Sequence, residues 1–162
     1  MRSVPKVLSI VVAAAVVLFA GSALAQPGAT PYGAPVSLEN AKKAAAAAVA
    51  EAKKNNWNMI IAVADPSGNL VYFEKMDGSS IGSGNVAIGK ARSAAIFRVP
   101  TKVFQERLAA GTTYYLAFES MMPLEGGIPI LMDGKVVGAI GASGGSFQQD
   151  GQVATAGVSV VK

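Results

Sequence analysis

The chain offers few of the side chains that enzymes use for chemistry. Its 162 residues include no histidine and no cysteine, so the sequence excludes an imidazole general base, a serine–histidine pair, a thiol nucleophile and a thiolate metal site. Its ten acidic residues show no pair at helix-face spacing beside apolar residues, which argues against a paired-carboxylate hydrolase. Recognition of any ligand must therefore come from shape, backbone amides and a few cations.

Cations gather in one segment that the composition marks as helical. Lys90, Arg92 and Arg98 give the stretch 85–97 and its end a basic side, and Lys90 lies among alanines and glycines. This side could be a solvated helix face. It could also be an anion clamp, in which Lys90 and Arg98 neutralise an acidic ligand at the edge of a sheet. Asp150, near the start of the last helix, could stabilise the helix dipole or act in catalysis.

Aromatic, thioether and hydroxyl side chains are densest between residues 113 and 122. Such residues are typical of a core or a subunit interface. A flat apolar cofactor would stack on the same side chains, and their oxygen or sulfur atoms could approach a metal without histidine. The residues concerned are Thr113, Tyr114, Tyr115, Met121 and Met122.

Two glycine-rich turns could bring the backbone close to a ligand. One is Glu125-Gly126-Gly127, and the other follows a strand at 138–145. The second lacks the spacing of a nucleotide-binding loop, so close backbone packing is the simpler interpretation. Its amides could still hold a carboxylate or propionate. The candidate ligand-binding residues are Lys90, Arg98, Thr113, Tyr114, Tyr115, Met122, Gly126, Gly127, Ser143, Gly144, Gly145 and Asp150.

Two predicted hairpins must position these residues. The apolar run 59–64 predicts a strand buried on both faces, and a turn at 65–69 joins it to a second strand at about 70–76. The runs 128–132 and 135–142 are joined by Asp133-Gly134, which is typical of a type I′ hairpin. Pro129 is expected on an edge strand or near the start of its strand, and Gly138 and Gly141 are expected where another backbone or a ligand comes close.

Helices are predicted around the two hairpins. Ser37 is expected to cap a helix that runs to Lys54, a second helix covers 85–97, Thr101 is expected to cap a short third one, and a fourth follows residue 145. The segment 112–122 is ambiguous between strand and helix. The order indicates an α+β domain in which one antiparallel sheet packs against helices.

The two ends of the domain carry distinct patterns. A basic head, an apolar run of 14 residues and Ala23-Leu24-Ala25 predict a signal peptide over 1–25, hence a periplasmic or secreted protein without a membrane span. Residues 26–35 are expected to form a flexible arm, and residues 36–162 are expected to form the domain.

The formal net charge of +4 includes two basic residues of the predicted signal peptide, so nucleic-acid binding is not indicated. Charged residues are 15% of the chain, against roughly 25% in average domains, which favours a homo-oligomer.

Several separated motifs together resemble the GlcG/HbpS-like family, over about 36–160. They are the turn 65–69, the segments 90–101 and 123–130, and the segment 138–145 with Asp150 and Ala156-Gly157. The resemblance implies a profilin-like fold with a five-stranded antiparallel sheet and helices on its faces, assembled as dimers and often octamers. It also implies haem binding, as in exported members. Because the chain has no histidine, haem would depend on Thr, Tyr, Met or Lys ligation, or on a purely apolar pocket.

The leading hypothesis from the sequence is an exported, non-catalytic protein whose oligomer binds a flat or anionic small ligand, with haem binding or sensing as the first candidate. The alternative is an enzyme, or an enzyme accessory, that acts on a small organic acid with Lys90 and Asp150 as its polar pair. A third possibility is a structural oligomer whose glycines serve packing alone.

Overall fold

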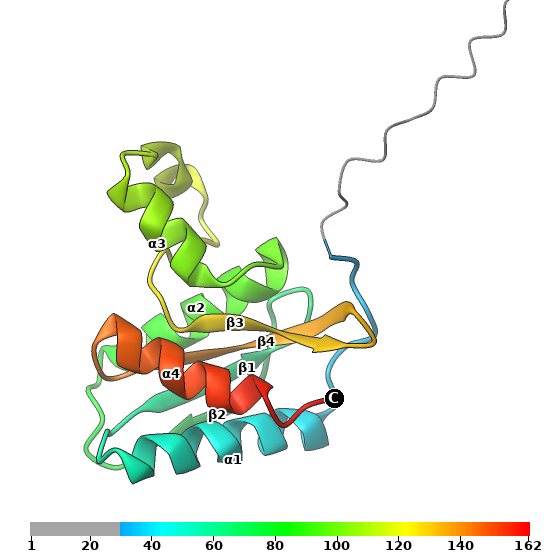
Figure 1. The fold of residues 1–162 in the computed structure, drawn as a ribbon, viewed down its shortest axis with the longest axis vertical. Helices are drawn as coiled ribbons and strands as arrows, with labels where there is room; N and C mark the ends of the chain where they lie inside the picture. Colours follow the sequence, from blue (N-terminus) through cyan, green and yellow to red (C-terminus); the bar gives the residue numbers. More distant parts are fainter. Residues whose placement is uncertain (1–29) are drawn as a thin grey trace, which may run out of the picture.

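One antiparallel sheet of four strands organises the protein (Figure 1). The structure is a computed structural model that describes residues 30–162; the predicted signal peptide and residues 26–29 of the predicted arm lie outside them. The strands lie side by side in the order β2-β1-β4-β3. Their bounds are Ile60–Ala64 for β1, Leu70–Lys75 for β2, Gly127–Met132 for β3 and Lys135–Ser143 for β4.

Helices cover both faces of the sheet. Figure 1 shows α1 and α4 together on one face and α2 on the other, while α3 and the short 3-10 helix η1 project beyond the sheet as a separate lobe. The bounds are Leu38–Lys54 for α1, Ser83–Phe97 for α2, Thr101–Ala109 for α3, Thr113–Ala117 for η1 and Phe147–Val158 for α4. Within residues 30–162 there is no helix with the length and apolar character to span a bilayer.

The central strand β1 is buried on both faces, as its apolar run predicted. Ile61 and Val63 belong to the core beneath α1 and α4, whereas Ile60 and Ala62 pack with α2. Because successive side chains of a strand point to opposite faces, a strand between two helical layers needs an unbroken apolar run.

Both predicted hairpins are confirmed. Asp133 and Gly134 have φ angles of 49° and 70°, as the two central positions of a type I′ turn require. At the other turn, one carboxylate oxygen of Asp65 accepts hydrogen bonds from the backbone N–H groups of Ser67 (2.8 Å) and Asn69 (2.9 Å). Pro129 lies on β3, which is an edge strand.

Three expectations about the secondary structure differ from the structure. The sheet has four strands, so the predicted five-stranded sheet is wrong. The segment 112–122, whose sequence was ambiguous between strand and helix, forms no strand. Its first part folds as η1, which lies on the lobe and away from the sheet. Thr101 does not cap α3; Pro100 occupies the cap position, and the Thr101 hydroxyl serves a turn described below.

The end of the predicted flexible arm is paired with the sheet. Val136 donates its backbone N–H to the Pro31 carbonyl at 2.8 Å, and Gly33 donates to the Val136 carbonyl at 2.8 Å. Tyr32 forms a parallel bridge with Val136. β1 pairs with β4 only as far as Ala139, which leaves this backbone free to bind the arm. The described part of the arm is therefore part of the fold.

The close contact between α2 and the sheet depends on Gly141 of β4. A Cβ atom at this position would lie against the Ala87 carbonyl oxygen and 2.6 Å from the Ala91 backbone nitrogen. Backbone atoms of a packed helix cannot move away as a flexible side chain can, so no residue with a Cβ fits here without a shift of α2.

We therefore expect Gly141→Ala to lower the free energy of unfolding by about 2–3 kcal/mol, measured by urea denaturation. Gly82→Ala is the control, because nothing lies within 4 Å of the added methyl group at that exposed position; its effect should stay within about 0.5 kcal/mol. Equal effects of the two substitutions would contradict the close approach at Gly141.

Candidate functional site

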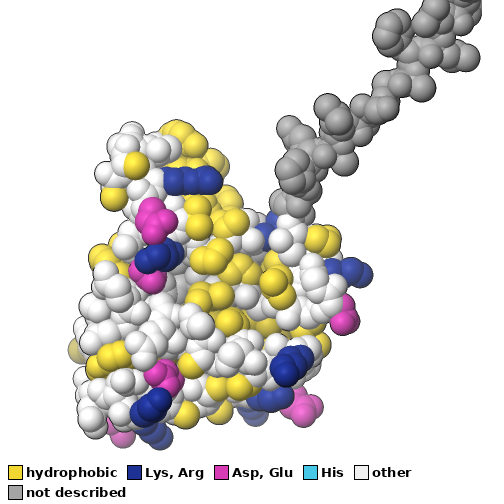
Figure 2. All heavy atoms as spheres, in the orientation of Figure 1, with side chains coloured by type: hydrophobic (Ala, Val, Ile, Leu, Met, Phe, Trp, Pro, Cys, Tyr) yellow, Lys and Arg dark blue, Asp and Glu magenta, His cyan; other side chains and the backbone are white. Residues whose placement is uncertain are grey.

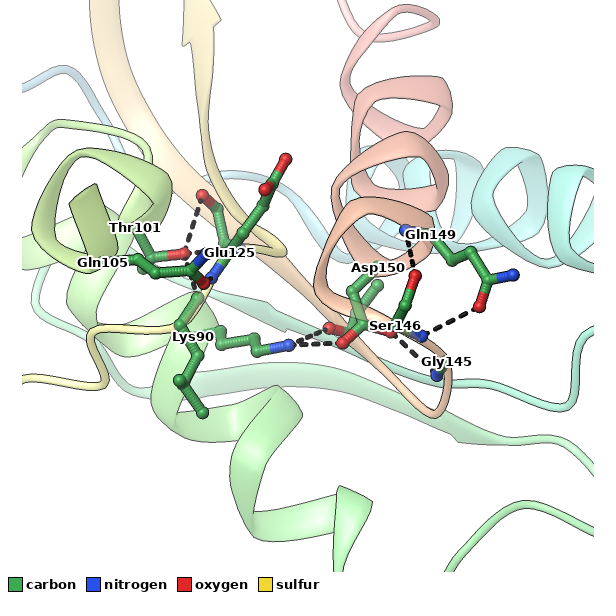
Figure 3. A network of polar contacts seen from close by, with 11 residues as sticks. Lys90, Thr101, Gln105, Glu125, Gly145, Ser146, Gln149 and Asp150 are labelled. Carbon is green, nitrogen blue, oxygen red and sulfur yellow. Dashed lines mark hydrogen bonds and ion pairs between the residues drawn. The ribbon is translucent and has the colours of Figure 1, made fainter. Parts of the chain in front are cut away.

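A buried ion pair lies between α2 and α4. The Lys90 ammonium is 2.6 Å from a carboxylate oxygen of Asp150, and the two side chains are 0% and 3% exposed. The same ammonium donates a hydrogen bond to the Ala142 carbonyl of β4 at 3.1 Å. Figure 3 shows the Lys90 side chain reaching across to Asp150 at the start of α4. The pair thus joins two helices on opposite faces of the sheet to a sheet strand.

Asp150 also organises the first turn of α4. Its second carboxylate oxygen accepts a hydrogen bond from the Gly145 backbone N–H at 3.0 Å, and a capping box of Ser146 and Gln149 satisfies the helix start (Figure 3). A carboxylate at this place interacts favourably with the helix dipole. The Gly145 amide, a candidate ligand donor from the sequence, is thereby used inside the protein.

Burial opposes the charges of both partners. It lowers the pKa of the Lys90 ammonium and raises the pKa of the Asp150 carboxyl group, while the contact between them acts in the opposite direction on each. Neither group reaches solvent, so a substrate cannot approach the pair. Removal of one partner would leave the other charge buried without a counter-charge. Such a loss strongly lowers the free energy of unfolding.

The turn before β3 is held by Thr101. The Thr101 hydroxyl donates to the Leu124 carbonyl at 2.6 Å and accepts from the Gly127 N–H at 2.9 Å, and the Gln105 side-chain oxygen accepts from the Glu125 N–H at 2.7 Å. The sequence did not identify this role of Thr101, because no local pattern relates it to a turn over twenty residues later.

Gly126 brings this turn against the ion pair. Its φ angle is 122°, a region that favours glycine, and an added Cβ would lie 2.9 Å from the Lys90 ammonium nitrogen and 2.8 Å from the Asp150 Cβ. Gly127 packs on the Lys90 carbonyl in the same way, and Gly144 packs on the Asn58 carbonyl. These glycines permit close contacts within the protein rather than with a ligand.

A cleft of about 330 Å³ opens beside this turn. Across it, the Lys102 ammonium lies 2.8 Å from a carboxylate oxygen of Glu125, so the charges at its wall are already paired. Its remaining lining residues are Pro100, Gly126, Gly127, Ile128, Gln148, Gly151, Gln152 and Thr155. This cleft offers no unmatched charge to an anionic ligand.

Arg98 lies away from Lys90, so the predicted anion clamp is not formed. The two residues are eight positions apart, or about 12 Å along a helix. Arg98 follows α2 in the left-handed conformation with φ 59°, donates to the Thr30 carbonyl at 3.1 Å and stacks on the Tyr32 ring at 4.6 Å. It therefore fastens the N-terminal arm. Ser143, another candidate, is buried at the end of β4 opposite Ile60.

Aromatic rings form the core of the lobe. The centroids of Phe104 and Tyr115 are 5.3 Å apart, and those of Phe97 and Phe104 are 5.5 Å apart. Phe104 and Tyr115 are buried, so α3 and η1 are held on the end of α2 by ring packing.

The outer side of the lobe is apolar and exposed. Tyr114 and Leu116 are 62% and 65% exposed, and Phe118 is also exposed. Figure 2 shows hydrophobic side chains gathered on the projecting lobe. The candidate Thr113 is exposed here, whereas Met122 is half-buried and packs at Gly89, where its Cε lies 3.0 Å from an ideal Cβ position.

A polar cluster lies at the edge of this apolar surface. Arg107 donates a hydrogen bond to the Tyr115 hydroxyl at 2.6 Å, and the Tyr114 hydroxyl donates to the same oxygen at 3.4 Å. The bond from Tyr114 and the bond from Arg107 lower the pKa of Tyr115, while the pKa of Tyr114 is raised by its contact with Tyr115. The sequence identified both tyrosines but not Arg107, because a turn at Gly111 separates it from them.

Comparisons with known proteins give consistent matches. Residues 36–159 match a family model described as haem degrading protein HbpS-like. Protein GlcG of Escherichia coli K12 is 39% identical over 108 residues, which cover 67% of this chain and 81% of that protein.

Solved structures match the fold. A double mutant of HbpS from Streptomyces reticuli is 30% identical, with a TM-score of 0.75 over 98% of this chain and 99% of that one. A complex of PduOC with haem, 21% identical, covers 79% of this chain and 96% of that one with a TM-score of 0.72, and shows likeness of fold alone. The mixed helix and antiparallel sheet fold is therefore shared with these structures.

The buried pair provides a test by a double-mutant cycle. We expect Lys90→Met or Asp150→Asn alone to lower the free energy of unfolding by about 3–5 kcal/mol, because each leaves a buried partner uncompensated. The free energy of unfolding of the double variant should fall by less than the sum of the two single losses. The difference, which is the coupling energy, should be about 1–3 kcal/mol.

Urea denaturation measures all three variants. The control pair is Lys102→Met and Glu125→Gln, whose ion pair is more exposed, with 49% and 14% of the side chains accessible, and should couple by less than about 1 kcal/mol. Additive losses for Lys90 and Asp150 would show that the pair does not act as a unit.

Proposed function

This chain belongs to the HbpS-like family, and from that premise we propose that it is an exported protein that binds a flat, largely apolar small molecule without converting it, with haem as the first candidate. The family description, haem degrading protein HbpS-like, supports a haem-related ligand. The solved PduOC–haem complex supports the capacity of this fold to hold haem. Export rests on the predicted signal peptide at 1–25.

The exposed apolar surface of the lobe is the observation that carries the proposal. Tyr114, Leu116 and Phe118 expose aromatic and aliphatic side chains next to one another in sequence. A flat macrocycle would cover such side chains and gain from burial of apolar area and from ring stacking. The surface lies on a lobe that packs mainly through its rings, so a ligand can bind there without disturbing the sheet.

The available donor atoms are compatible with ferric haem. The chain has no histidine or cysteine, and among residues 30–162 no three acidic side chains converge on a site for a metal ion. Tyrosine oxygen remains, and tyrosine is an established axial ligand of haem iron. Haem would supply the porphyrin plane and a ferric ion; the chain would supply the apolar contact and the oxygen.

The organic-acid alternative gains no support from the described residues. It depended on Lys90 and Asp150 as an accessible polar pair, but both side chains are enclosed. Arg98, the second proposed cation for an acidic ligand, binds Thr30 and Tyr32 instead.

We propose further that the protein is a homo-oligomer, from dimer to octamer. Exposed large hydrophobic side chains at several places, among them Ile81 (91% exposed), and the low share of charged residues support this. Multi-angle light scattering of the purified protein should give a mass of at least twice that of one chain; a monomeric mass would overturn the proposal.

Titration with haemin tests the proposed ligand. We expect a shifted Soret band and a raised melting temperature when haemin is added to the purified protein. Leu116→Ser should weaken binding by about tenfold, because it removes apolar area from the lobe, whereas Leu38→Ser, an exposed leucine of α1, should leave it unchanged.

Two results would contradict the proposal. An unshifted Soret band together with an unchanged melting temperature would exclude haem. Bleaching of the Soret band by the bound protein in the presence of ascorbate and oxygen, but not by the Leu116→Ser variant, would show conversion of haem and overturn the non-catalytic part.

A further inference from the structure

We propose that two copies of this chain bind each other through strand β2, with the two β2 strands paired antiparallel about a two-fold axis at Phe73. The inference rests on the proposed homo-oligomer and names the surface that forms it. It starts from the two edges of the sheet, β2 and β3 (Figure 1), which differ in their capacity to accept another strand.

The outer edge of β2 has unpaired backbone groups. Met76, the residue after β2, donates its N–H to the Met59 carbonyl at 3.1 Å, so Glu74 also faces β1 with its backbone, because these groups alternate along an antiparallel strand. The backbone groups of Phe73 and Lys75 then point away from β1. Within the described part of the chain, no hydrogen bond reaches them. Such an edge can pair with the strand of another molecule.

The opposite edge is less suited to pairing. Ala142 donates its N–H to the Gly126 carbonyl at 2.8 Å, so by the same alternation Ile128 faces β4 and Pro129 turns its backbone outward. Proline has no N–H group to donate to a neighbouring strand. β2 contains neither proline nor glycine, and its valine, tyrosine and phenylalanine favour strand structure. Of the two edges, β2 is therefore the one that can accept a partner strand.

The face of β2 that lies toward α2 is apolar and exposed. Leu70 and Phe73 are 46% and 39% exposed, and Ile81, in the turn before α2, is 91% exposed. The Phe73 ring lies at the start of α2, with its Cζ 3.7 Å from an ideal Cβ position at Gly84. Helix α2 packs mainly on the other three strands, so it leaves these side chains beside the open edge. A second copy paired with β2 would cover them.

The side chains of β2 select the register of the pairing. An axis at Phe73 places the two Phe73 rings opposite each other, and such cross-strand aromatic pairs are stabilising. It also places Glu74 opposite the second copy's Tyr72, whose hydroxyl donates to Glu74 of its own chain at 3.1 Å. An axis at Tyr72 would set the Glu74 carboxylate against Leu70. An axis at Glu74 or at Lys75 would bring like charges together, which is destabilising.

The charges beyond the two ends of β2 are complementary. Asp77 follows the strand, whereas Arg92 donates to the Gly68 carbonyl at 3.2 Å in the turn that precedes it. An antiparallel pair places Asp77 of each copy beside Arg92 of the other, whereas a parallel pair would bring the two Asp77 side chains together. Opposite charges at both ends fix the orientation of the partner. The surface is thus self-complementary, as a two-fold interface requires.

A single introduced cysteine reports the position of the axis, because the chain has none of its own. Phe73→Cys should form a disulfide-linked dimer under mild oxidation, since directly opposite Cα atoms lie about 5.5 Å apart, within the range of a disulfide. Lys75→Cys is the matched control on the same strand. Its two copies would lie about 13 Å apart along the strands, so this variant should stay unlinked. Electrophoresis of the purified protein without reductant measures both.

A change of charge at the axis tests the interface without cross-linking. Phe73→Glu should lower the mass measured by light scattering by about twofold or more, because two carboxylates would meet at the axis. Phe73→Leu keeps an apolar side chain and should keep the mass. Circular dichroism of each variant establishes that it is folded.

The outcomes separate the interface from the proposed homo-oligomer. If Phe73→Cys links no better than Lys75→Cys, the axis at Phe73 is wrong. If folded Phe73→Glu keeps the mass of the unmodified oligomer, β2 is not the interface, while the homo-oligomer stands. A monomeric mass for the unmodified protein would overturn the homo-oligomer itself and this interface with it.

Discussion

The buried pair of Lys90 and Asp150 is the constraint on which the arrangement of the interior depends. One ammonium group contacts α4 through a carboxylate and β4 through a carbonyl oxygen, so α2 and α4 are fixed relative to each other through the sheet. Two charges inside a small domain are tolerated only when each satisfies the other. The glycine at 126 follows from this pair, because its backbone packs directly on both side chains.

The enclosed interior determines where binding can occur. Residues whose types suggested an anion site, Lys90 and the glycines of two turns, are used by the protein to close its own core. Arg98 is used to fasten the N-terminal arm along β4. The Lys90 ammonium and the Gly145 amide, which the sequence offered to a ligand, are therefore bonded within the fold. Exposed apolar and aromatic groups remain on the lobe of α3 and η1.

The lobe differs physically from the sheet domain beneath it. Its rings pack on one another and on the end of α2, while its outer side chains meet solvent. An exposed apolar surface of this kind carries a cost in water that a ligand or another subunit relieves. The tyrosine–arginine cluster at its edge adds a charged donor to that surface.

The sequence by itself determined the local structure. Turn chemistry at Asp133-Gly134, an apolar run in β1 and a capping serine before α1 are each encoded within a few residues, and the structure bears them out. The motifs also identified the family. The tertiary structure alone decided that Lys90 meets Asp150, sixty positions away, that Arg107 meets Tyr115, that Arg98 turns to the arm, and that the segment after α3 forms no fifth strand. These contacts depend on how whole helices pack on the sheet, and no local propensity or spacing encodes that packing.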